Sequence, residues 1–219
     1  PEMKVFERLV FFLTSKPNCI SHTLPNFSKA INKGLRAIID ETEERKSKTP
    51  DTSNDPSKIE FYSAISEALE GIIAYSKNLS KKAREMADKE NDPALKKELL
   101  DIAEINSHVP EFPARTFREG LTTIWICWIA CHLENPNVGL SLGRLDQILY
   151  PLYHQDIENK TITIQDAIEL LCCLWLKIGD HVPTIPDAGE QLFGGTGSNQ
   201  AITIGGVDRD GKDAVNDLT

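Results

Sequence analysis

Apolar residues recur at helical spacing through the first half of the chain. An apolar stripe predicts a helix that starts near Phe27, with Asn26 or Ser28 as its cap. A long amphipathic helix is predicted for residues 57–89, and Asp92-Pro93 opens another that ends before Pro110. The positions expected to face inward are Phe27, Ile31, Leu35, Ile38, Ile39, Phe61, Ile65, Leu69, Ile72, Ile73, Leu79, Leu95, Leu99, Ile102 and Ala103.

The second half continues the helical pattern and then changes. The most apolar helix is expected at residues 115–133, and another carries Leu145, Ile148, Leu149 and Leu152. Thr163 and Asp166 should cap a helix at 164–178 that is largely buried. Alternating β-branched residues predict a strand at 200–206, followed by a tight turn at 207–211 and a new helix from Asp213.

The composition is that of a globular domain with a surface linker. The 219 residues are 40% hydrophobic and 26% charged, enough for one sizeable core and one or two subdomains. Two prolines and small polar residues mark a linker near residues 49–57. The longest apolar run, residues 121–133, is too short to cross a bilayer. A buried helix is the better interpretation.

Charge and the chain ends limit the classes of protein. A formal net charge of −9 gives no overall field that attracts nucleic acid or an anionic membrane. The opening residues 1–4 lack a signal-peptide pattern, which favours the cytoplasm. Position 1 is not Met, and the helix expected from Asp213 has barely begun at Thr219. We therefore expect both ends to be boundaries within a longer protein.

The five cysteines indicate reduced thiols and no metal site. An odd count without a signal peptide is typical of a reducing compartment. Cys127 and Cys131 lie one helical turn apart, and Cys172 adjoins Cys173, so either pair could carry chemistry. Their apolar neighbours favour burial in the core instead, where free cysteine packs as a small apolar residue.

Three segments in order carry a resemblance to a known family. They are residues 109–120 (VPEFPARTFREG), residues 141–153 (SLGRLDQILYPLY) and residues 204–219 (IGGVDRDGKDAVNDLT). Each resembles a segment of the pyruvate formate-lyase-like glycyl radical enzymes, and the resemblance covers essentially the whole chain. The run GRLDQ followed by LYPLY is similar to the branch of dehydratases and of C–N, C–C or C–S lyases. Pyruvate formate-lyase itself lacks the Asp-Gln after Gly-Arg.

The resemblance implies a fold and a chemistry. The family fold is a ten-stranded α/β barrel wrapped by helices, so this α/β segment should be a mostly helical part of its N-terminal half. A glycyl radical and a catalytic cysteine act in the closed barrel, which keeps the reacting groups in contact and excludes water. Both loops are expected beyond Thr219, so this chain would hold no catalytic residue and be inactive alone. The implied partners are a small-molecule substrate, a radical-SAM activating enzyme that installs the radical, and a second subunit.

The resemblance also implies three substrate contacts. His22, in a His-x-x-Pro segment, would hydrogen-bond a substrate hydroxyl and help it to leave as water; otherwise it is an ordinary polar loop residue. Ser141 would bind a substrate hydroxyl or carboxylate, or simply cap the helix that follows. Some relatives carry a bulky apolar residue near the position of Asn199. The polar Asn199 departs from that pattern and favours a polar substrate. Arg144 and Asp146 are expected to fix their loop through structural hydrogen bonds.

Two other functions stay open at this point. The chain could be a non-catalytic helical binding or structural domain derived from the family. It could also belong to a formate C-acetyltransferase, which would need two adjacent cysteines on the finger loop. A reading frame that continues past Thr219 with the cysteine and glycyl loops would favour the lyase or dehydratase.

Overall fold

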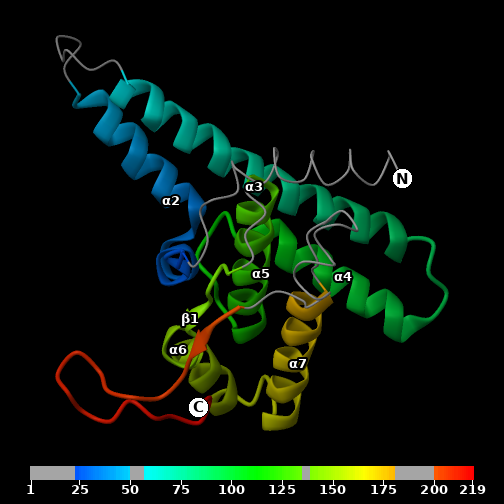
Figure 1. The fold of residues 1–219 in the computed structure, drawn as a ribbon. Coiled ribbons are helices and arrows are strands. Elements are labelled where there is room, and N and C mark those ends of the chain that lie inside the picture. Colours follow the sequence, from blue (N-terminus) through cyan, green and yellow to red (C-terminus); the bar gives the residue numbers. More distant parts are fainter. Residues whose placement is uncertain (1–22, 50–56, 135–138, 181–199) are drawn as a thin grey trace, which may run out of the picture. The chain divides into compact units, whose positions relative to one another are not determined.

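The fold is mostly helical in the part of the chain that the computed structural model describes, residues 23–49, 57–134, 139–180 and 200–219 (Figure 1). Two very short strands accompany the helices, which confirms the expected helical segment with few strands. None of the described helices is both long and apolar enough to span a membrane. The elements are α2 (Phe27–Ser47), α3 (Ser57–Ala87), α4 (Pro93–His108), α5 (Phe117–Glu134), β1 (Gly143–Arg144), α6 (Leu145–Glu158), α7 (Ile164–Asp180) and β2 (Ile202–Thr203).

The chain forms two compact units. One comprises residues 26–127, and the other comprises residues 1–25 with 128–219. The division falls within α5, after Cys127. We call them the helical unit and the strand-bearing unit, and each is described by itself.

In the helical unit, α2 is interrupted to admit a connector. Asn26 caps the helix as predicted, its side chain accepting a hydrogen bond from the Lys29 amide at 3.0 Å. At Gly34 the backbone leaves helical geometry, with φ of 74°. The next two amides, of Leu35 and Arg36, donate to carbonyl groups of the connector that follows α4. A non-helical glycine thus lets another segment complete the backbone bonding of α2.

Small residues form the seam between α3 and α4. The buried positions of α3 are Ile73, Ser76, Ser80, Ala83 and Ala87, at alternating spacings of three and four. The hydroxyl of Ser80 donates to the backbone carbonyl of Ala103 in α4 at 2.5 Å. Serine and alanine allow the two helices to approach closely, so large apolar residues are not needed there.

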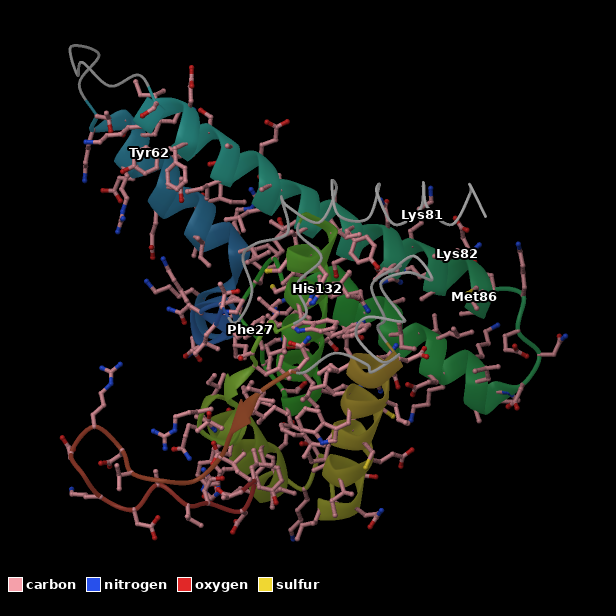
Figure 2. All side chains as sticks on the ribbon, viewed as in Figure 1. Phe27, Tyr62, Lys81, Lys82, Met86 and His132 are labelled. Atoms are coloured by element: carbon pink, nitrogen blue, oxygen red, sulfur yellow. The ribbon has the colours of Figure 1, made fainter. Side chains whose placement is uncertain are left out.

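Part of the inward face that the sequence predicts for α3 and α4 is wrong. Phe61 was expected inside but is 64% exposed, and Leu95 is 48% exposed. Ile73 and Ala103 are buried as expected. On α3, Lys81, Lys82 and Met86 are exposed (Figure 2). The prediction placed large apolar residues at the interface, whereas two closely packed helices bury mainly small side chains there.

In the strand-bearing unit, β1 and β2 form a parallel pair. Gly143 is opposite Ile202, and Arg144 is opposite Thr203. The strand at 200–206 was predicted, although only two of its residues are assigned to it, whereas β1 was not expected at all. It escaped because two residues are too few to show an alternating pattern.

The predicted cap of α7 is confirmed, but two predictions about its burial are wrong. Thr163 and Asp166 cap it reciprocally as expected, with the Asp166 amide donating to the Thr163 hydroxyl at 3.2 Å. The helix is not largely buried, because only one narrow stripe faces inward. Cys172 and Cys173 lie off that stripe and are exposed, so the predicted core packing of this pair is wrong. The buried stripe is Ala167, Leu174 and Ile178. Cys127 is buried and Cys131 half-buried.

Residues 213–219 do not form the predicted helix. The carboxylate of Asp213 accepts a hydrogen bond from the Val215 amide at 3.0 Å, and the side-chain oxygen of Asn216 accepts one from the Leu218 amide at 2.9 Å. These local bonds compete with helical bonding. The turn predicted at 207–211 is confirmed by the bond between the Asp208 amide and the Lys212 carbonyl, at 2.8 Å.

Candidate functional site

Asp146 is the hub of the strand-bearing unit. Its side chain is 2% exposed and lies in the first turn of α6. The carboxylate accepts hydrogen bonds from the Gly205 amide at 2.7 Å, the Thr219 hydroxyl at 2.8 Å and the Gln147 amide at 2.8 Å. Gly205 and Thr219 both belong to the segment 204–219. One carboxylate therefore ties together two of the three segments that carried the family resemblance.

Arg144 and Gln147 reinforce the same connection. The guanidinium of Arg144 donates to the carbonyl groups of Val207 at 2.8 Å and Gly205 at 2.6 Å. The side-chain amide of Gln147 donates to the carbonyl of Ala214 at 2.6 Å. The expectation that Arg144 and Asp146 fix their loop is confirmed. We call residues 144–147 together with their partners in 205–219 the Asp146 clamp.

Asp146 stays ionised without a cationic partner in the described part of the chain. Burial opposes the charged form, but the hydrogen bonds from Gly205, Thr219 and Gln147 outweigh it and hold the pKa of Asp146 below its ordinary value. Among the described residues, the carboxylate is therefore stabilised by several hydrogen bonds from neutral donors and not by a cation. Its role is to hold the two segments in register.

Ser141 lies where three segments of backbone meet. Its amide donates to the carbonyl of Thr23 at 3.0 Å, and the next amide, of Leu142, donates to the carbonyl of Ala201 at 3.1 Å. Helix α6 has Arg144 as its N-cap, so Ser141 does not cap it. No hydrogen bond links the Ser141 hydroxyl to any other described residue. The hydroxyl is thus available to a ligand.

The other two predicted contacts, His22 and Asn199, lie outside the described residues. Their neighbours in sequence are informative: Thr23 follows His22, and Ala201 stands two positions after Asn199. Both neighbours bond to the backbone at Ser141 and Leu142. These backbone bonds therefore hold Thr23 and Ala201 beside the chain at Ser141 and Leu142.

Gln200 was not predicted as a site residue. The nitrogen and the oxygen of its side-chain amide are both shielded from solvent, and neither has a hydrogen-bond partner among the described residues. Sequence reasoning passed over it as a polar residue at a strand entrance. A glutamine beside an alternating apolar strand was the available signal, and it is too common to be specific.

The third resemblance segment forms a separate clamp in the helical unit. Glu111 is 7% exposed, and its carboxylate is bound by Arg36 at 2.8 Å and Lys77 at 2.5 Å. Burial raises the pKa of Glu111, but hydrogen bonds from Lys77 and Arg36 more than compensate and leave the pKa below its usual range. The same segment holds α2 through backbone bonds at Leu35 and Arg36. We call this set the Glu111 clamp.

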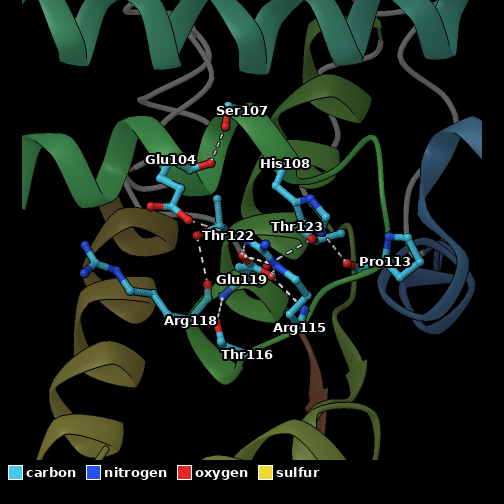
Figure 3. A network of polar contacts seen from close by, with 10 residues as sticks. All are labelled: Glu104, Ser107, His108, Pro113, Arg115, Thr116, Arg118, Glu119, Thr122 and Thr123. Atoms are coloured by element: carbon cyan, nitrogen blue, oxygen red, sulfur yellow. Dashed lines mark hydrogen bonds and ion pairs between the residues drawn. The ribbon is translucent and has the colours of Figure 1, made fainter. Parts of the chain in front are cut away.

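The start of α5 adds a second buried acid to this segment. The carboxylate of Glu119, 2% exposed, accepts from the Arg115 amide at 2.6 Å and pairs with its guanidinium at 2.5 Å (Figure 3). The Thr116 hydroxyl accepts from the Glu119 amide at 3.2 Å, and the Thr123 hydroxyl donates to the Glu119 carbonyl at 2.9 Å. The run TFRE thus starts the helix with a cap, and its polar residues are structural.

The described residues offer hydrogen-bonding groups for a ligand and no metal site. They contain no group of three or more His, Cys, Asp or Glu side chains placed to hold a metal ion. The acids of both clamps are occupied by protein donors. In the strand-bearing unit, the Ser141 hydroxyl and the Gln200 amide have no hydrogen-bond partner among the described residues.

Comparison with known proteins agrees with the resemblance. An isethionate sulfite-lyase of Nitratidesulfovibrio vulgaris is 36% identical over 198 residues, covering 89% of this chain and 24% of that protein. The 4-hydroxyphenylacetate decarboxylase glycyl radical subunit of Clostridioides difficile is 35% identical over 210 residues, covering 90% of this chain and 23% of that protein. The chain therefore spans about a quarter of the length of these curated relatives.

Solved structures share the fold. A glycyl radical enzyme from Archaeoglobus fulgidus superposes with a TM-score of 0.84 at 34% identity, over 95% of this chain and 28% of that chain. The B12-independent glycerol dehydratase from Clostridium butyricum gives 0.83 at 33% identity, over 92% and 25%. The family described as pyruvate formate lyase-like matches residues 2–219. With the three segments and their clamps in place, the chain belongs to the pyruvate formate lyase-like family of glycyl radical enzymes.

Proposed function

We propose that this chain is part of a glycyl radical lyase or dehydratase that acts on a small polar substrate by thiyl-radical hydrogen abstraction. The observation that carries the proposal is the Asp146 clamp, which joins the GRLDQ run to the segment 204–219. The GRLDQ run, followed by LYPLY, resembles the lyase and dehydratase branch, and the segment 204–219 resembles the family as a whole. The matched relatives include a sulfite-lyase, a decarboxylase subunit and a dehydratase.

The substrate contacts of this proposal are His22, Ser141 and Asn199. Ser141 would donate a hydrogen bond from its hydroxyl to a substrate hydroxyl or carboxylate, or accept one from a substrate hydroxyl. His22 would hydrogen-bond the hydroxyl that leaves as water. Asn199 would favour a polar substrate. The Asp146 clamp would act indirectly, by fixing the strand that follows Ser141.

The radical chemistry would come from residues outside this sequence. None of the 219 residues forms the Arg-Val-x-Gly-Tyr signature of a glycyl loop. In the proposal, a glycyl radical installed by a radical-SAM activating enzyme generates the thiyl radical that attacks the substrate. The residues of this chain bind and orient the substrate, and the whole enzyme works as a cytoplasmic homodimer.

The test uses the complete reading frame that contains this chain. The protein is activated anaerobically with its radical-SAM enzyme, examined by electron paramagnetic resonance, and offered isethionate, glycerol and 1,2-propanediol. We expect a glycyl radical doublet and substrate-dependent product formation. The 219-residue chain treated in the same way should give no doublet.

Two results would replace the proposal. A stop codon soon after Thr219 with no downstream cysteine and glycyl loops would indicate a non-catalytic binding or structural domain. A doublet accompanied by acetyl transfer between pyruvate and formate, with two adjacent cysteines on the finger loop, would indicate a formate C-acetyltransferase.

A further inference from the structure

We propose that Gln200 determines specificity in the substrate site by hydrogen-bonding a substrate hydroxyl beside Ser141. This inference rests on the proposed function and deepens it, because it names the substrate hydroxyl as the chemical group that the site recognises. Gln200 immediately precedes Ala201, whose carbonyl accepts the Leu142 amide at 3.1 Å. Gln200 and Ser141 therefore each stand one residue from the same backbone bond.

The condition of the Gln200 side chain points to a ligand. Both polar atoms of its amide are shielded from solvent and lack a partner among the residues that the structure describes. A buried amide without partners is costly, so native proteins rarely retain one unless something else completes it. Arg144 also has one unpaired buried nitrogen, but its guanidinium is already anchored to two carbonyl groups. At Gln200, by contrast, both polar atoms of the side-chain amide lack a hydrogen-bond partner among the described residues.

The chemistry of the amide selects the ligand group. A glutamine side chain offers N–H donors and a carbonyl acceptor together. A carboxylate or a sulfonate accepts only, and would leave the Gln200 carbonyl oxygen bare. A hydroxyl both donates and accepts, so it can satisfy either atom and can bond the Ser141 hydroxyl as well. Among hydroxyl, carboxylate and sulfonate groups, the one that can satisfy either amide atom of Gln200 is thus the alcohol.

Stability of the 219-residue chain provides the first test. Because the Gln200 amide has no partner in the described part of the chain, Gln200→Leu should leave the thermal midpoint unchanged or raise it. The control Gln165→Leu alters an exposed glutamine of α7 and should also leave the midpoint unchanged. A clear fall for Gln200→Leu alone would show that the amide stabilises the fold, and would overturn the proposal.

Ligand binding to the full-length protein, without activation, provides the second. The probes are isethionate, ethanesulfonate, which lacks the hydroxyl, and glycerol. Gln200→Leu should weaken binding of the hydroxyl-bearing probes about 10-fold or more, and Gln165→Leu should not. Ethanesulfonate should bind equally to wild type and Gln200→Leu. Equal loss for isethionate and ethanesulfonate, or no loss at all, would contradict hydroxyl recognition.

A crystal structure of the full-length protein in glycerol decides the case if none of the probes binds measurably. The proposal expects glycerol or ordered water on the Gln200 amide, whereas a bond to a protein group would overturn it. Failure of the proposed function has a different signature, since it would remove the glycyl radical signal from the activated wild type and leave the binding comparison intact.

Discussion

The two units each bury a carboxylate that connects distant segments, but they satisfy the charge in different ways. Glu111 of the helical unit is held by two cations, Arg36 and Lys77. Asp146 of the strand-bearing unit is held by two amides, a hydroxyl and a side-chain amide. The attraction between two charges falls off slowly with distance, whereas a hydrogen bond from a neutral donor weakens steeply when the donor leaves the line of the bond. The second design suits a segment that must be positioned, such as the one that carries Ser141.

The largest expected effect comes from removing the Asp146 charge. In Asp146→Asn, the new NH2 group faces either the donors of Gly205 and Thr219, which share one carboxylate oxygen, or the Gln147 amide at the other oxygen. We expect a loss of about 3 kcal/mol in the unfolding free energy of the strand-bearing unit, measured by urea denaturation. The control Asp208→Asn, at an exposed turn, should change stability by less than about 1 kcal/mol. Equal effects of the two would mean that the clamp is unimportant.

The same carboxylate predicts a dependence on pH. The folded pKa of Asp146 is lowered, so its contribution is fully present above the unfolded value of about 3.9. The contribution should decline as the pH falls from that value through the lower folded pKa. Stability of wild type and of Asp146→Asn, measured from pH 6 to pH 2, should therefore converge at the acid end. A constant difference would refute this assignment.

A smaller effect is expected from the glycine that admits the Glu111 clamp. A Cβ at Gly34 would overlap the carbonyl oxygen of Glu111, and its φ of 74° is unfavourable for other residues. Gly34→Ala should cost about 1–3 kcal/mol or more of unfolding free energy. Gly71→Ala, in an open position of α3, should stabilise the chain by about 0.5–1 kcal/mol. The same sign for both substitutions would contradict the account of the α2 break.

The hydroxyl at the α3–α4 seam should matter least of the three. Ser76 is 1% exposed and donates to the carbonyl of Val109 at 2.8 Å, next to the Glu111 segment. Ser76→Ala should cost about 1–2 kcal/mol, because it leaves a buried acceptor poorly satisfied. Ser107→Ala, on the exposed side of α4, should change stability by less than about 0.5 kcal/mol. Thermal unfolding of the two variants measures the difference.

Features with local causes could be predicted from the sequence. The cap at Asn26, the Asp92-Pro93 start of α4 and the capping pair Thr163–Asp166 each depend on a few neighbouring residues, and all are confirmed. The turn at 207–211 belongs to the same class. Local hydrogen bonding and restricted backbone angles act over three or four positions, so they are visible in one sequence.

Features with distant causes escaped. The exposure of Cys172 and Cys173 depends on which stripe of α7 faces its unit, and an apolar helix does not reveal that stripe. The chain at 213–219 is attached through the Thr219 hydroxyl to Asp146, 73 positions away, and the sequence pattern that predicted a helix there does not show this attachment. At the site, Ser141, Arg144 and Asp146 were singled out from the sequence, whereas Gln200 was missed because an unpartnered amide is recognised only in three dimensions.

Hydrogen exchange tests most directly whether two independent clamps exist and whether Asp146 positions the Ser141 segment. Amide exchange is compared in wild type, Asp146→Asn and Glu111→Gln. Asp146→Asn should speed exchange at Leu142 and Gly205 and leave Leu35 and Arg36 protected, while Glu111→Gln should do the reverse. Loss of protection in both units from either substitution, or unchanged exchange at Leu142 in Asp146→Asn, would contradict the account.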